Sequence, residues 1–136
     1  MMDEGQIIPF ETSPLPVEEG PWLVFAPHAD DESFGMGGSL AKAADQGIRV
    51  ELVIMTDGSL GGSQENLIDI RKKEAFAAAS LLGLERPVFL NNRDRELNLD
   101  ENTIAQVVQE IKRVSPAAVF FPGVFEIHPD HRKTAL

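Results

Sequence analysis

The chain has 136 residues, a length that corresponds to a single domain. Cysteine is absent, which excludes disulfide bonds, thiolate ligands and a cysteine nucleophile, so a metal site has to be built from His, Asp and Glu. With 12 basic and 22 acidic residues, the net charge of −10 argues against a nucleic acid or an anionic membrane as partner. The opening residues lack the features of a signal peptide, and we expect a soluble, cytoplasmic protein.

Residues 1–20 are polar and are interrupted by three prolines, which predicts an extended N-terminal lead-in to one domain over residues 21–136. Four short apolar runs follow within that domain, over residues 22–26, 49–55, 87–90 and 117–121. Runs of this length without polar alternation are typical of strands that are buried on both faces of a parallel sheet.

Segments with helical spacing lie between the apolar runs, over residues 37–46, 64–82 and 101–114. Gly47 and Gly83 are placed to end the first two helices, and Asp100 is placed to cap the third. In the third segment the apolar residues Ile104, Val107, Val108 and Ile111 recur at helical spacing. The order β-α-β-α-β-α-β predicts an α/β fold, a Rossmann-like three-layer sandwich with a mostly parallel sheet of strand order 3-2-1-4.

All three histidines follow the first and the fourth predicted strand, and two carboxylates follow the first. Ligands of open α/β sheets bind beyond the carboxyl ends of the strands. In the order 3-2-1-4 the two strands are neighbours, so His28, His128 and His131 would meet Asp30 and Asp31 in one crevice. His and Asp are the ligands that a hydrolytic zinc site requires.

Two simpler interpretations apply to the loop after the first strand. Its acidic residues can serve only to stabilise a helix N-terminus, where negative charge is favoured. Its glycines invite comparison with a dinucleotide-binding loop, but Leu40 stands where the last glycine of G-x-G-x-x-G is needed. We therefore do not expect nucleotide binding of that kind, and it is the pairing of the two histidine loops that favours a functional site.

Two motifs in these loops resemble the signatures of a known enzyme family. Ala-Pro-His-Ala-Asp-Asp-Glu spans residues 26–32, and His-Pro-Asp-His spans residues 128–131. Together they resemble the PIG-L/LmbE-like deacetylases, zinc-dependent amidases that remove acetyl groups from N-acetylglucosamine-type sugars. The Thr-Asp-Gly turn at 56–58 and the Arg71-x-x-Glu74 pair also fit the family, and the resemblance runs from about Trp22 to the end of the chain.

The resemblance implies a ligand set and an ion. His28, Asp31 and His131 correspond to the three metal ligands, and three protein ligands leave an open position for water, as a catalytic zinc needs. The expected ion is Zn²⁺, although Fe²⁺ would also be accepted by this donor set.

The resemblance also implies roles for five further residues. Asp30 corresponds to the general base, Asp130 to a carboxylate that orients a histidine, and His128, if protonated, would stabilise the oxyanion of the tetrahedral intermediate. Arg71 and Asp94 correspond to positions that face the sugar.

The implied activity is that of a metal-dependent hydrolase, which removes an acetyl group from the amide nitrogen of an N-acetylglucosamine-type sugar or conjugate. Two alternatives stay open: a metallohydrolase that acts on a phosphoester at the same site, and a metal-binding domain without catalysis. The chain ends at Leu136, shortly after His131, where family members continue. We therefore expect that the C-terminal part of the domain is missing, and that exposed apolar surface leaves a homo-oligomer open.

Overall fold

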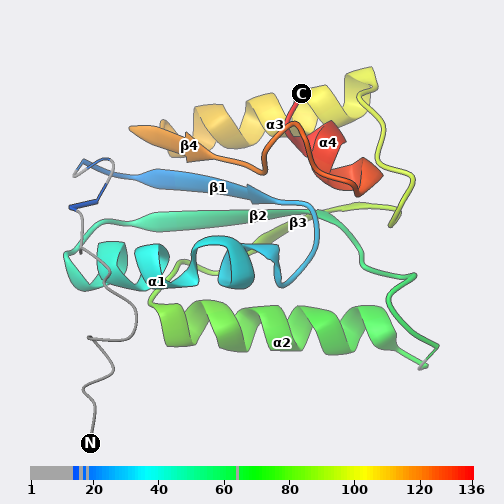
Figure 1. Cartoon of the computed structure of the whole chain (residues 1–136), viewed down its shortest axis with the longest axis horizontal. Coiled ribbons are helices and arrows are strands. Elements are labelled where there is room, and N and C mark those ends of the chain that lie inside the picture. Colours follow the sequence, from blue (N-terminus) through cyan, green and yellow to red (C-terminus); the bar gives the residue numbers. More distant parts are fainter. Residues whose placement is uncertain (1–13, 16, 18, 64) are drawn as a thin grey trace, which may run out of the picture.

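The computed structural model describes residues 14, 15, 17, 19–63 and 65–136, so most of the predicted lead-in lies outside the described residues. Strands and helices alternate along the chain (Figure 1). The elements are β1 (Trp22–Ala26), α1 (Asp31–Asp45), β2 (Val50–Thr56), α2 (Leu67–Leu82), β3 (Val88–Asn92), α3 (Glu101–Val114), β4 (Ala118–Phe120) and α4 (Pro129–Thr134). In the described part of the chain, no helix has both the length and the apolar character needed to cross a bilayer.

The four strands form one parallel sheet with the order β3-β2-β1-β4, which confirms the predicted order. β1 is central, and Val24 pairs with Leu52 of β2 on one side and with Phe120 of β4 on the other. Because β1 and β4 run in the same direction side by side, the two loops that carry the histidines leave the sheet at the same edge.

Helices cover both faces of the sheet, with α1 and α2 on one side and α3 on the other (Figure 1). The residues of β1 therefore alternate between two cores. Trp22, Val24 and Ala26 pack with Leu40 of α1, while Leu23 and Phe25 pack in the core on the α3 side. The prediction of strands buried on both faces is confirmed for β1 and β2. It is wrong for β3 and β4, which are only partly buried because each outer strand has a single neighbour.

The helix limits agree with the sequence where a local signal marks them. α3 begins and ends as predicted, and the side chain of Asp100 accepts a hydrogen bond from the Thr103 N–H at 2.8 Å. α1 instead begins at Asp31 rather than at the predicted Gly37, because the helix continues through the glycine-rich segment with a kink at Met36. Its first turn therefore belongs to the motif that carries the carboxylates.

The apolar residues of α3 are only partly covered. Val107 and Val114 pack in the core on this side of the sheet, but Ile104, Val108 and Ile111 are 49%, 40% and 38% exposed, whereas Thr103 and Glu110 are buried. Polar contacts give the helix this rotation. The Thr103 hydroxyl lies 3.3 Å from Asn92 Oδ1 at the end of β3, and Arg113 joins Glu110 of its own helix to the buried Glu51 of β2 at 2.8 and 2.9 Å, an ion pair that burial makes sensitive to loss of either partner. These groups hold the helix with Ile104, Val108 and Ile111 turned outward.

Candidate metal centre

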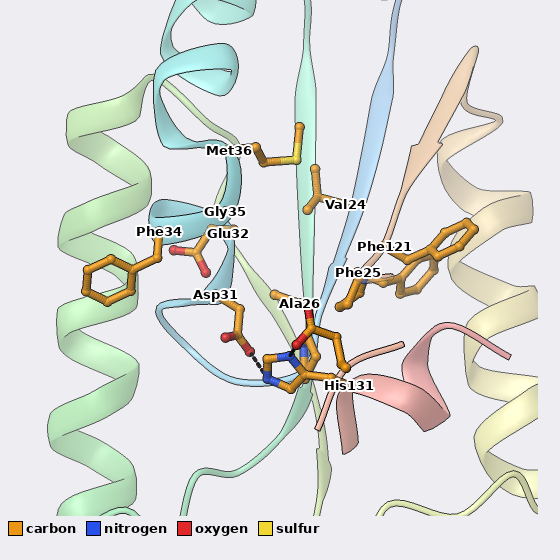
Figure 2. Close-up of a pocket in the computed structure, with 13 residues that line it drawn as sticks. Val24, Phe25, Ala26, Asp31, Glu32, Phe34, Gly35, Met36, Phe121 and His131 are labelled. Carbon is orange, nitrogen blue, oxygen red and sulfur yellow. Dashed lines mark ion pairs between the residues drawn. The ribbon is translucent and has the colours of Figure 1, made fainter. Parts of the chain in front are cut away.

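Three side chains from the two histidine loops meet around one carboxylate oxygen. Asp31 Oδ2 lies 3.2 Å from His28 Nδ1. The same oxygen lies 3.1 Å from His131 Nε2 (Figure 2). The backbone N–H of His28 donates to the same oxygen at 2.9 Å. His28 follows β1, Asp31 is the first residue of α1 and His131 lies in α4, so the parallel pairing of β1 with β4 brings the three predicted metal ligands together.

His128 completes a cluster of three imidazole rings. Its ring centroid lies 4.7 Å from that of His28 and 5.3 Å from that of His131. Among the described residues these histidines form one of two groups whose ligand atoms lie within 4.8 Å of one another. The donor set of imidazole nitrogens beside the Asp31 carboxylate fits Zn²⁺, which prefers nitrogen and carboxylate oxygen where thiolates are lacking.

The second group shares His28 and His128 and adds two buried carboxylates, Asp94 and Asp130. Asp130 is 1% exposed, and its Oδ2 lies 3.1 Å from His28 Nε2. The same oxygen accepts a hydrogen bond from the Arg95 N–H at 2.7 Å. A carboxylate at Nε2 would keep the proton on that nitrogen, so that Nδ1 could offer its lone pair to a cation bound beside Asp31.

Both carboxylate oxygens of Asp94 have partners within the protein. Asp94 is 5% exposed, its Oδ1 lies 3.3 Å from His28 Nε2, and its Oδ2 accepts a hydrogen bond from the Leu60 N–H at 3.1 Å. Sequence reasoning expected Asp94 to face the sugar, but here both carboxylate oxygens are engaged by the chain. Contact between Asp94 and a substrate stays a prediction, and its present partners tie the loops after β2 and β3 to His28.

The backbone that precedes His28 is held by a residue that sequence reasoning did not assign. Thr56, at the end of β2, is 1% exposed and donates two hydrogen bonds to the Pro27 carbonyl, from its hydroxyl at 2.8 Å and from its N–H at 3.1 Å. Thr56 is the first residue of the Thr-Asp-Gly turn, and this turn was the feature of the sequence that pointed to it. Its role follows only from the position of β2 beside β1.

Asp30 and Arg71 lie away from the histidines, in a cavity of about 340 Å³ between the start of α1 and α2. Asp30 is the exposed N-cap residue of α1, and in the described structure its side chain makes no capping hydrogen bond. The Arg71 guanidinium lies against the glycine loop after β2, with Nη2 at 3.5 Å from the Gly61 carbonyl. The predicted base and the predicted sugar-binding residue therefore line the same cavity.

Comparison with known protein families gives a match over most of the chain. Residues 23–136 match the profile of the family described as GlcNAc-PI de-N-acetylase, PIG-L. The chain belongs to the PIG-L family.

Several relatives of this PIG-L chain are named as deacetylases. It is 34% identical over 118 residues to a diacetylchitobiose deacetylase of Thermococcus kodakarensis, a match that covers 81% of this chain and 44% of the relative. It is 29% identical over 124 residues to a probable N-acetyl-alpha-D-glucosaminyl L-malate deacetylase 2 of Bacillus anthracis, covering 82% and 54%. The structure of the N,N'-diacetylchitobiose deacetylase of Pyrococcus horikoshii superposes with a TM-score of 0.78 at 38% identity, covering 83% and 45%. The chain thus spans about half the length of these relatives.

In the PIG-L site, His28 and Asp31 shift each other's pKa. Burial by itself lowers the pKa of His28, but its hydrogen bonds to Asp31 and Asp130 outweigh burial and raise that pKa above its usual value. Burial by itself raises the pKa of Asp31, and the hydrogen bonds from His28 overcome it and lower that pKa. The metal-free site therefore favours an imidazolium beside a carboxylate, and a cation bound there would replace the proton of His28.

The pKa of His128 shifts in the opposite direction to that of His28. Burial, followed by the nearby charge of His28, lowers the pKa of His128. Its Nδ1 accepts a hydrogen bond from the Asp130 N–H at 3.3 Å, which leaves the proton of the neutral ring on Nε2. At neutral pH the ring is therefore uncharged, whereas the role expected from the sequence assumed a protonated ring.

Glu32, the last residue of the first motif, was given no role by the sequence. It is 4% exposed, and Ser33 Oγ donates to its Oε1 at 2.7 Å. Its Oε2 has no hydrogen-bond partner within the described residues, and burial raises the pKa of this carboxyl. A glutamate in an acidic motif gives no sign of such burial until the helix that carries it is placed.

Proposed function

We propose that the chain is a metal-dependent hydrolase that removes an acetyl group from the amide nitrogen of an N-acetylglucosamine-type sugar or conjugate. The observation that carries the proposal is the meeting of His28, Asp31 and His131 around one carboxylate oxygen at the edge of the sheet. The names of the relatives, which include deacetylases of diacetylchitobiose and of a glucosaminyl malate, support this reaction and this class of substrate.

His28 Nδ1, Asp31 Oδ2 and His131 Nε2 would hold the ion, with Zn²⁺ as the expected metal and Fe²⁺ as a second that the donors accept. A bound ion supplies a water of pKa about 7 and a positive charge for the developing oxyanion. Asp130 acts on His28 by holding the Nε2 proton, so that Nδ1 presents its lone pair.

Asp30 is the general base of the proposed reaction. Its carboxylate is exposed to the cavity that Arg71 also lines, and it is not used as a helix cap in the described structure. It takes a proton from the attacking water and passes that proton to the amine as the C–N bond breaks.

His128 supplies a hydrogen bond to the oxyanion. Because Nδ1 accepts the Asp130 N–H, the neutral ring carries its proton on Nε2 and donates from there without having to be protonated. Arg71 donates to the sugar in the cavity that it lines with Asp30, and contact of Asp94 with the sugar stays a prediction beside its contact with His28. Placement in the cytoplasm, the absence of nucleic-acid and membrane partners, and the oligomeric state stay predictions.

The proposal is tested by metal content and acetate release. The purified chain is loaded with Zn²⁺, dialysed and analysed by elemental mass spectrometry, and acetate is measured with N-acetylglucosamine and diacetylchitobiose. Asp31→Ala and His131→Ala should lose the metal, whereas Asp30→Ala should keep it and release no acetate. Asp69→Ala, an exposed position on α2, is the control for loss of one acidic side chain.

Equal metal content in all variants would contradict the assigned ligands. Release of phosphate from a phosphoester, with no acetate from either sugar, would favour the alternative metallohydrolase. Bound metal with neither product would favour a metal-binding domain without catalysis.

A further inference from the structure

Two cavities lie beside the first turn of α1, and their linings differ. One, of about 340 Å³, is lined by the charged side chains Asp30, Arg71 and Glu74 together with apolar residues of α2. The other, of about 420 Å³, is bordered by Asp31 and His131. Glu32 lines both cavities and stands at the division between them.

The larger cavity extends from the metal ligands along the apolar surface of β1. In Figure 2 Asp31 and His131 lie at one end, and Met36 and Val24 lie at the other. Phe121, which follows β4, lines the cavity from the side of β4. Its walls are therefore mostly hydrocarbon, as in small-molecule sites, whose volumes range from about 300 to 1,000 Å³.

The charged side chains that line this cavity indicate which kind of ligand it can bind. Among the described residues that line it, the acidic side chains are Asp31, Glu32 and Glu126, and none is Lys or Arg. A chain that ends in a phosphate or a carboxylate would meet only like charge there, which is unfavourable in a partly desolvated site. The lining fits a neutral aliphatic group.

We propose that this cavity receives the acyl group of the substrate amide. The protein then acts on N-acyl amino sugars whose neutral acyl group is longer than acetyl. The inference rests on the proposed function, because it places the scissile amide at the ligands that Asp31 and His131 provide. An amide carbonyl carries its amine on one side and its acyl chain on the other. The cavity that Asp31 and His131 border accepts the acyl chain toward Met36, and the amine side of the amide carries the sugar toward Arg71.

The reaction is hydrolysis and needs no further reagent. The C–N bond breaks, the oxygen of water joins the acyl carbon, and the water's protons leave that oxygen. The nitrogen gains a proton and departs as the amine, and the acyl group departs as its carboxylate. An acetyl methyl would fill only a small part of the cavity, whereas each added methylene would come out of water against Val24, Met36 or Phe121.

The experiment compares N-acetyl-, N-butyryl- and N-hexanoylglucosamine on the Zn²⁺-loaded chain. Binding is measured by isothermal titration calorimetry, and release of the corresponding acid is measured in parallel. We expect the affinity to rise about fourfold for each methylene that becomes buried. A flat or falling affinity along the series would overturn the inference.

Two matched glycine variants locate the effect. Gly35 lines the cavity and Gly38 does not, and a Cβ built on either residue meets no neighbouring atom within 4 Å, so the two variants are matched at Cβ. Gly35→Leu should bring the ratio of hexanoyl to acetyl affinity close to one, and Gly38→Leu should leave the ratio of the unmodified chain. Phe121→Ala, at a side chain that is 56% exposed, should lower the ratio without endangering the fold.

If Gly35→Leu and Gly38→Leu have the same ratio as the unmodified chain, the chain does not use this cavity for the acyl group. If affinity rises with acyl length and Gly35→Leu abolishes the rise while no acid is released from any substrate, the hydrolase function fails and the acyl site stands. The two failures are thereby distinguished.

Discussion

His28 Nε2 lies 3.1 Å from Asp130 Oδ2, although 102 positions separate the two residues along the chain. Asp130 reaches this place because β4 runs beside β1 and α4 follows β4 after the loop over residues 121–128. The carboxylate is 1% exposed and also accepts the Arg95 N–H, so its position is set by the loop after β3 as well. The orientation of one proposed metal ligand therefore depends on a buried group from the far end of the sequence.

Asp130→Asn should lower the affinity for Zn²⁺ about 10- to 100-fold, the usual effect of removing a carboxylate that orients a metal-binding histidine. The amide keeps the size of the side chain but not the charge that holds the Nε2 proton. Competition with a chromophoric chelator measures the dissociation constant. Asp69→Asn, on the exposed side of α2, should match the unmodified chain. An Asp130→Asn affinity equal to that of the Asp69→Asn control would show that Asp130 does not orient His28.

Thr56→Val should lower the free energy of unfolding by about 1 kcal/mol, because the variant loses one buried hydrogen bond to the Pro27 carbonyl. The loss stays moderate because the backbone N–H at the same position still donates to that carbonyl. Denaturation in urea, followed by circular dichroism, measures the difference. Thr56→Ser keeps the hydroxyl and should keep the affinity for Zn²⁺, which Thr56→Val should reduce. Equal affinities in the two variants would mean that the hydroxyl does not position His28.

Gly61→Ala should displace the Arg71 side chain and leave the fold intact. A Cβ at Gly61 would overlap the Arg71 guanidinium, which is the free end of a flexible side chain and can swing aside. If Arg71 binds the sugar, affinity for N-acetylglucosamine should fall about tenfold, as expected for loss of a charged hydrogen bond. Gly62→Ala is the control, because its Cβ meets only Leu67, at 3.5 Å, an ordinary contact. Unchanged sugar binding in Gly61→Ala would remove Arg71 from the proposed sugar site.

Glu32→Met should stabilise the chain at neutral pH and have little effect in acid. Burial raises the pKa of Glu32 in the folded state, so the unfolded chain releases this proton at lower pH than the folded chain does. The unmodified protein therefore loses stability as pH rises through the ordinary glutamate pKa, about 4.3, and the loss levels off above the raised folded pKa.

Thermal melts of Glu32→Met at pH 7 and pH 4 test this expectation. At pH 7 the melting temperature should exceed that of the unmodified chain by about 4 °C, the effect of ~1 kcal/mol in a domain of this size. The gain should shrink toward pH 4, where Glu32 is protonated in both states. Glu85→Met, at an exposed glutamate, controls for the added apolar side chain. A variant that melts lower at pH 7 would show that the Glu32 carboxylate is satisfied in solution.

The sequence alone determined the elements that local chemistry specifies. Uninterrupted apolar runs marked β1 and β2, Asp100 marked the start of α3, and Gly83 adopts the left-handed conformation that ends α2. Such signals act between neighbours in the chain, and they do not depend on what packs against them. The two histidine loops were readable for the same reason, since each carries its motif in a few consecutive residues.

Only the tertiary structure decided which faces and which atoms meet. The helical spacing of α3 did not show which of its residues are buried: Thr103 is buried and contacts Asn92, while Ile104 and Val108 are largely exposed. Contact of Asp94 with a sugar stays a prediction, and only the fold shows that both of its oxygens have partners in the loops after β1 and β2. These outcomes depend on buried polar groups that must find partners across the sheet, and the cost of leaving one unpaired is a property of the folded arrangement rather than of any local run of residues.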